Sequence, residues 1–292
     1  DKPAHQMKPI VKFHKYSLSF VNPPNARTPS STIEGALIMI NGGYGCIQPW
    51  PTLGDKNLEY HLDSILSDTP SEIAQAAIKC CMIDSEARKN KFNLFESIKI
   101  PKHHLTLSHH NYDELNTSLL NQFTHIKLKS DNNYNSTIKI MNELMKFNFR
   151  IDFNNSLTPD QLIGFCDSLS RELIERIDFI EDPFPFDPEL WNEYQDKTGI
   201  NFALDRGPYY ADKGFSIRVW KPLITPKVES NSPICITHNM DHELGRRYAI
   251  YCASVSKYCD DIHGTGEFNA NNNGHGLGMD EYLKSLSWND LV

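Results

Sequence analysis

The chain has 292 residues, of which 39% are hydrophobic, so it is long enough to bury a large core. Its formal net charge of −8 argues against nucleic acid as a partner, and no apolar stretch reaches the roughly 18 residues that span a bilayer. The seven cysteines lack metal-type spacing and no secretory signal is visible, so we expect free thiols in a cytoplasmic protein.

The N-terminal third predicts a small α+β domain. Extended stretches at residues 12–20 and 35–45 flank a polar loop that contains Arg27, and residues 61–98 have helical composition. We predict a capping domain over residues 1–100, completed by the C-terminal segment from about residue 268 to 292.

The segment 125–129 predicts a strand that buries lysines. After a first strand at 105–108, the sequence places His125, Lys127 and Lys129 on one face of this second strand and two aliphatic residues on the other. An unpaired ammonium is costly to remove from water, so we expect acidic groups opposite these lysines.

The segments that follow supply those acidic groups. Each is a short apolar strand with a charged residue at its carboxyl end, and in chain order these are Asp152, Glu181, Asp205 and Lys221. Helical stretches at residues 136–146 and from Thr158 onward fill the first gaps, Thr158 being an N-cap that precedes a proline. The gaps on either side of Lys221 are too short for a full crossover helix, so we expect one helix to be shortened and the other missing or vestigial.

Alternating strands and helices predict an α/β fold with a parallel sheet. Charged tips on five consecutive strands favour a (β/α)7β-type TIM barrel over residues 101–267, with its active site at the C-terminal ends of the strands and some outer helices shortened. An open doubly wound sheet is the competing fold, but it would concentrate function at one crevice. In a barrel, Lys129 and Lys221 face each other across the mouth, with the three carboxylates between them.

This arrangement predicts a metal-assisted proton transfer. Three carboxylates favour a hard cation, Mg²⁺ first and Mn²⁺ second. Such an ion draws charge onto a bound substrate carboxylate, and a flanking lysine removes the neighbouring carbon-bound proton. Nearby cations lower the pKa of that lysine toward the useful range.

The pattern resembles the enolase superfamily. The motifs that carry the resemblance are Lys127-x-Lys129, Asp152-x-Asn154, Glu181-Asp182-Pro183, Asp205 after Ala203-Leu204, and Lys221-Pro222. Within the superfamily the chain looks most like the o-succinylbenzoate synthase family. The short length, the Arg150-x-Asp152-x-Asn154 form and the absence of an Asp-x-Asp on the eighth strand support this comparison.

The resemblance implies an activity and a role for five residues. It implies Mg²⁺-dependent dehydration of a cyclohexadiene carboxylate (SHCHC) to o-succinylbenzoate in menaquinone biosynthesis, through a metal-stabilised enediolate. On this basis Asp152, Glu181 and Asp205 bind the metal. Lys129 abstracts the proton alpha to the carboxylate and returns a proton to the departing hydroxyl, and Lys221 steadies the enediolate.

Other residues are expected to bind substrate or to support the site, namely Lys127, Arg150, Asn154 and Arg27. Cys46 stands where many relatives have glutamate, and residues 238–243 replace a segment that is serine-rich in relatives, so no substrate contact is carried over there. Adjacent residues on a strand point apart, so we expect the pair His103-His104 to be solvated rather than to bind zinc.

Two other functions remain open. A racemase of N-succinylamino acids or a dipeptide epimerase uses the same scaffold, because two opposed lysines move a proton from one face of a carbon to the other. A barrel that has lost catalysis and serves as a binding protein is the second alternative. In either enzymatic case we expect a monomer that acts on a small-molecule carboxylate.

Overall fold

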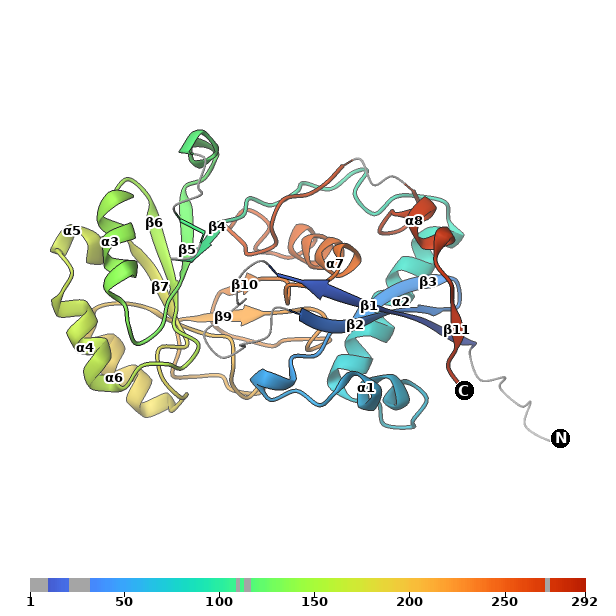
Figure 1. Cartoon of the computed structure of the whole chain (residues 1–292), viewed down its shortest axis with the longest axis horizontal. Coiled ribbons are helices and arrows are strands. Elements are labelled where there is room, and N and C mark those ends of the chain that lie inside the picture. The colour runs from blue at the N-terminus through green and yellow to red at the C-terminus, as the bar shows by residue number, and fades with distance from the viewer. Residues whose placement is uncertain (1–9, 21–31, 109–110, 113–116, 271–273) are drawn as a thin grey trace.

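The structure is a computed structural model of the chain and describes residues 10–20, 32–108, 111–112, 117–270 and 274–292. It has two parts (Figure 1). One is an antiparallel sheet covered by α1 (Leu58–Ile65) and α2 (Glu72–Lys89). The other is a curved parallel sheet with helices on its outer side, and α7 (Glu243–Ser254) lies between the two parts.

The antiparallel sheet has the order β11-β1-β2-β3. Its strands are β1 (Val11–Ser19), β2 (Thr32–Ile40), β3 (Gly43–Ile47) and β11 (Asn289–Asp290). The C-terminal β11 pairs with β1, so the end of the chain returns to the sheet in which it begins. A β-carbon at Gly43 would lie 2.0 Å from the carbonyl oxygen of Cys81, so this glycine is what allows α2 to approach β3 closely.

The parallel sheet has seven strands in the order β10-β9-β8-β7-β6-β5-β4. They are β4 (Leu105–Ser108), β5 (His125–Lys129), β6 (Asn148–Asp152), β7 (Ile177–Glu181), β8 (Phe202–Leu204), β9 (Ile217–Trp220) and β10 (Ile234–Ile236). Lys129 pairs with Asp152 and Asp152 with Glu181, so the register brings the charged strand ends into one row. The side chains of β5 and β6 that point the other way, such as Leu128 and Ile151, are buried under the helices.

The outer helices follow only some of the strands. They are α3 (Asn135–Glu143), α4 (Pro159–Asp167), α5 (Arg171–Glu175) and α6 (Pro188–Thr198), with α8 (Asp280–Ser285) near the C-terminus and short 3₁₀ helices at Pro51–Leu53 and Thr117–Gln122. No helix forms in residues 205–216 or 221–233, all of which the structure describes. The helix between Lys221 and β10 was predicted to be missing or vestigial, which is confirmed. The helix between Asp205 and Lys221 was predicted to be shortened, but it is absent.

The eighth strand is reduced to two residues. His263 makes a parallel bridge to His103, just before β4, and Gly264 makes one to Thr237, just after β10. This segment links the two edges of the seven-stranded sheet. The predicted fold class is therefore confirmed. The chain forms a modified α/β barrel with an N-terminal capping domain, and some outer helices of the barrel are absent. In the part of the chain that the structure describes, no helix is both long and apolar enough to cross a bilayer.

Candidate active site

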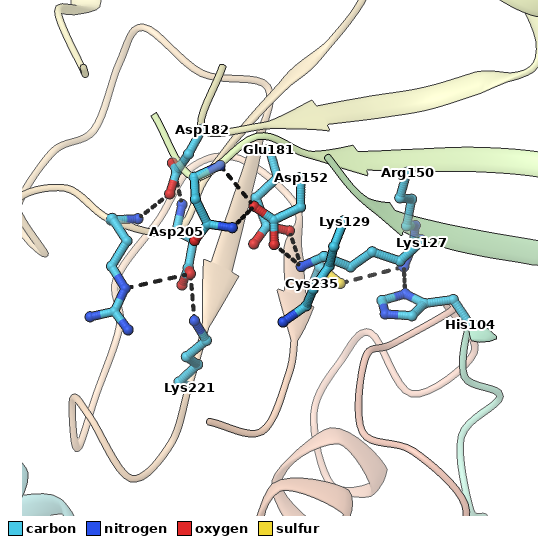
Figure 2. A network of polar contacts seen from close by, with 12 residues as sticks. His104, Lys127, Lys129, Arg150, Asp152, Glu181, Asp182, Asp205, Lys221 and Cys235 are labelled. Atoms are coloured by element: carbon cyan, nitrogen blue, oxygen red, sulfur yellow. Dashed lines mark hydrogen bonds and ion pairs between the residues drawn. The ribbon is translucent and has the colours of Figure 1, made fainter. Parts of the chain in front are cut away.

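The carboxylates of Asp152 and Glu181 meet at the carboxyl ends of β6 and β7, where Lys127 joins them. The Nζ of Lys127 lies 3.0 Å from Oδ2 of Asp152 and 2.7 Å from Oε2 of Glu181 (Figure 2). All three residues are buried, Glu181 to 2% exposure. Asp152 and Glu181 are thus acidic groups of the kind that the sequence predicted opposite the lysines of β5, and Lys127 holds both carboxylates at once.

Asp205 follows β8 and is paired with a different lysine. Its Oδ2 accepts a hydrogen bond from the Nζ of Lys221, which follows β9. Burial alone would raise the pKa of Asp205, but the charges of Lys221 and Arg206 outweigh burial and bring it to about 2. Asp205 is therefore ionised, and the Nζ of Lys221 is held beside it.

Lys129 lies in a different environment from its two neighbours. Burial lowers its pKa to about 8, Lys127 and Lys221 add to the shift, and Asp152 opposes it. Its Nζ is 3.6 Å from the sulfur of Met240, a weak acceptor. Among these lysines Lys129 has the ammonium most ready to lose its proton, which is the property a general base requires.

The carboxylates form a strongly negative group. Burial, followed by the charge of Asp152, raises the pKa of Glu181 to about 7. Burial also raises the pKa of Asp182 well above its usual range, and its carboxylate accepts the backbone N–H groups of Asp205 and Arg206 at 3.1 and 2.9 Å. Crowded, buried carboxylates of this kind are stabilised by a cation.

A cavity of about 160 Å³ opens over these groups. The charged side chains that line it include Lys127, Lys129, Asp152, Asp205, Arg206 and Lys221. Its uncharged lining consists of residues that include His104, Thr106, Thr237, His238 and Gly264, with Trp50 and Leu53 contributed by the capping domain. The cavity therefore fits a small anionic molecule that also has an uncharged part.

The capping domain is fastened to this cavity by the loop after β10. The side chain of Gln48 donates to the carbonyl of Met240 at 2.8 Å, and the side chain of Asn239 donates to the carbonyl of Gln48 at 2.9 Å. The indole of Trp50 also donates to the carbonyl of Asn239 at 3.0 Å. These bonds fix Met240, and with it the thioether beside Lys129, relative to both parts of the molecule.

Known proteins are similar to this chain in sequence and in fold. Residues 11–87 match the family model described as "O-succinylbenzoate synthase, N-terminal domain". An o-succinylbenzoate synthase of Bdellovibrio bacteriovorus is 23% identical, over 96% of this chain and 98% of that protein. The resemblance to the enolase superfamily, and within it to o-succinylbenzoate synthases, is confirmed.

Solved structures support the fold. The o-succinylbenzoate synthase of Thermosynechococcus elongatus, solved with magnesium in its active site, superimposes with a TM-score of 0.64 at 15% identity, covering 88% of this chain and 92% of that one. The L-Ala-D/L-Glu epimerase of Bacillus subtilis, solved with substrate bound, gives a TM-score of 0.64 at 16% identity, covering 88% and 89%. The chain therefore shares its fold with these structures, and its sequence is similar to that of o-succinylbenzoate synthases.

Three other residues were predicted to bind substrate or to support the site, and only one of them lines the cavity in the described structure. Asn154 lines the cavity, and its side chain donates to Oδ1 of Asp152 at 2.9 Å, so it orients that carboxylate. Arg150 is not among the residues that line the cavity, and it donates to Asp178 at 2.7 Å and to the carbonyl of Ile262 at 2.8 Å. Arg27 lies outside the described residues. Arg150 therefore acts as a support within the barrel.

Two predictions about neighbouring residues need comment. We expected His104 to be solvated, which is wrong, because it is only 5% exposed and lines the cavity. Its place before the first strand was visible in the sequence, but the segment that covers it, around His263, lies far away in the chain. Cys46, at the position where relatives have glutamate, is fully buried and contacts the hydroxyl of Tyr16 at 3.0 Å, away from the cavity.

Proposed function

We propose that this protein catalyses the Mg²⁺-dependent dehydration of the cyclohexadiene carboxylate SHCHC to o-succinylbenzoate, a step of menaquinone biosynthesis. The observation that carries the proposal is the pair of lysines, Lys129 and Lys221, lining one cavity together with Asp152 and Asp205. The similarity to o-succinylbenzoate synthases over nearly the whole chain supports this reaction among those that the superfamily fold accommodates.

The metal would be held by Asp152, Glu181 and Asp205. Their oxygens are the donors that Mg²⁺ and Mn²⁺ prefer, and their crowding and burial fit a divalent cation. In the described part of the chain no three acidic, histidine or cysteine side chains are grouped closely enough to hold an ion as they stand. Two of these carboxylates are bound to Lys127 and the third to Lys221, so we infer that an ion competes with Lys221 for Asp205.

The proton transfers are assigned to the lysines. When bound, Mg²⁺ withdraws charge from the substrate carboxylate and so acidifies the adjacent C–H bond. Lys129, with its pKa of about 8, removes that proton as the free amine. It then gives the proton to the hydroxyl group that departs from the next carbon, so that water leaves and a ring double bond forms. The side chain of Lys221 stabilises the negative charge that develops on the carboxylate.

A direct assay tests this reaction. The purified protein is mixed with SHCHC and Mg²⁺, and the loss of diene absorbance is followed with and without EDTA. We expect a loss that depends on the protein, stops with EDTA and yields o-succinylbenzoate as the product. Absence of product at a high enzyme concentration would contradict the proposal.

Racemisation of N-succinylamino acids is the second candidate, because the two lysines that line the cavity allow a proton to be removed from one face and returned to the other. Loss of optical rotation with deuterium uptake in D₂O would favour it over dehydration. A third reading, a barrel without catalysis, would be supported if calorimetry detected no Mg²⁺ binding.

A further inference from the structure

Two residues of the uncharged lining of the cavity, His104 and Thr237, each have a polar atom without a hydrogen-bond partner among the described residues. His104, just before β4, and Thr237, just after β10, both line it and are 5% and 6% exposed. Among the described residues, Oγ1 of Thr237 has no hydrogen-bond partner. Leaving a buried polar group unpaired costs free energy, so such a group points to a missing ligand atom.

The protonation of His104 follows from its neighbour. Its Nδ1 lies 3.1 Å from Nη1 of Arg150, and arginine has only donors, so Nδ1 is the acceptor. Burial, reinforced by the charges of Arg150 and Lys127, holds the pKa of His104 well below its usual range. The ring is therefore neutral and carries its proton on Nε2, for which the described residues provide no hydrogen-bond partner.

Gly264 lies beside the side chains of both His104 and Thr237. A β-carbon built at Gly264 would lie 3.1 Å from Nε2 of His104 and 2.6 Å from Cγ2 of Thr237. Both side chains thus border the space that the glycine leaves empty. A residue with a side chain would collide there, so the small size of Gly264 keeps this part of the cavity open.

We propose that His104 and Thr237 form a subsite that donates two hydrogen bonds to a carbonyl oxygen of the substrate. An imidazole N–H and a hydroxyl are neutral donors, which suit an uncharged acceptor, whereas a carboxylate would be held by the cations that line the cavity, Lys127, Lys129, Lys221 and Arg206. A carbonyl oxygen has two lone pairs and accepts both donors. This inference rests on the proposed function, in which the group bound is the ketone of the succinyl side chain.

Ligand binding tests the subsite without turnover. The affinities of o-succinylbenzoate and of the analogue in which a methylene group replaces the ketone are measured by calorimetry in the presence of Mg²⁺. We expect the wild-type protein to favour the ketone by about tenfold, as a lost buried hydrogen bond implies. Thr237→Val keeps the shape and removes the hydroxyl, so the preference should fall to about twofold, while the methylene ligand binds as before.

A second threonine provides the matched control. Thr106 lines the same cavity but is exposed on β4, and Thr106→Val should keep the wild-type preference. Gly264→Ala gives a second variant: its methyl group should weaken binding of the ketone ligand more than that of the methylene ligand. The subsite is overturned if Thr237→Val retains the wild-type preference or if both threonine variants lose it equally. If the wild-type protein binds neither ligand, the proposed function fails and the subsite falls with it.

Discussion

Replacing Lys127 by methionine tests how the buried charges are held. Methionine has nearly the volume of the lysine stem but no charge, so the variant leaves Asp152 and Glu181 facing each other without the ammonium between them. Breaking a buried ion pair by removing one partner costs about 3–5 kcal/mol. In the wild-type protein Lys127 lowers the pKa of Glu181, so in the variant Glu181 takes up a proton more readily. This limits the loss of unfolding free energy to about 3 kcal/mol near pH 7, which for a chain of 292 residues lowers the melting temperature by about 5 °C.

The loss should also depend on pH. A carboxyl group whose pKa is raised in the folded state stabilises the protein below its unfolded pKa, and this contribution is lost as pH rises through the folded pKa. Since Lys127→Met raises the pKa of Glu181 further above about 7, the gap between variant and wild type should widen from about pH 6 to pH 8.

Thermal unfolding followed by circular dichroism without divalent cations measures this difference. The matched control is Lys139→Met, which removes an ion pair of 3.8 Å with Glu143 whose side chains are 74% and 44% exposed. An exposed pair contributes little, so this variant should stay within about 1 kcal/mol of the wild type. Equal, small shifts for both variants would refute the role given to Lys127.

Three further predictions concern catalysis. Lys129→Ala should abolish turnover while calorimetry shows Mg²⁺ affinity within about twofold of wild type, and retained activity would remove Lys129 from its role. Glu181→Gln should weaken Mg²⁺ binding by about tenfold or more, whereas an unchanged metal dependence of the rate would mean that the ligand set is misassigned. Because burial lowers the pKa of Lys129 to about 8, kcat/KM should rise with pH and level off above that value, and a flat profile would contradict the assignment of the base.

The sequence was most informative where charge and periodicity coincide. The strands predicted at 105–108 and 125–129 match β4 and β5. Alternation of side chains marks both strands, and a charged residue also marks the end of the second. The missing helix between Lys221 and β10 was predicted from the length of the gap alone. These features depend only on residues that are near one another in the sequence, so the sequence pattern is sufficient to predict them.

Features that depend on distant contacts were not predictable. The burial of His104 depends on the segment near His263, and the position of Met240 depends on bonds to Gln48. The periodicity of the sequence does not indicate which distant residues come into contact. The uncharged lining of the cavity could therefore be identified only from the folded structure.

A crystal structure with Mg²⁺ and o-succinylbenzoate is the most direct test of the central claim. We predict one ion with oxygens of Asp152, Glu181 and Asp205 at about 2.0–2.1 Å, Asp205 released from Lys221, and the amines of Lys129 and Lys221 on opposite sides of the ligand. Asp205 still bound to Lys221, with the three carboxylates holding no ion between them, would contradict the account.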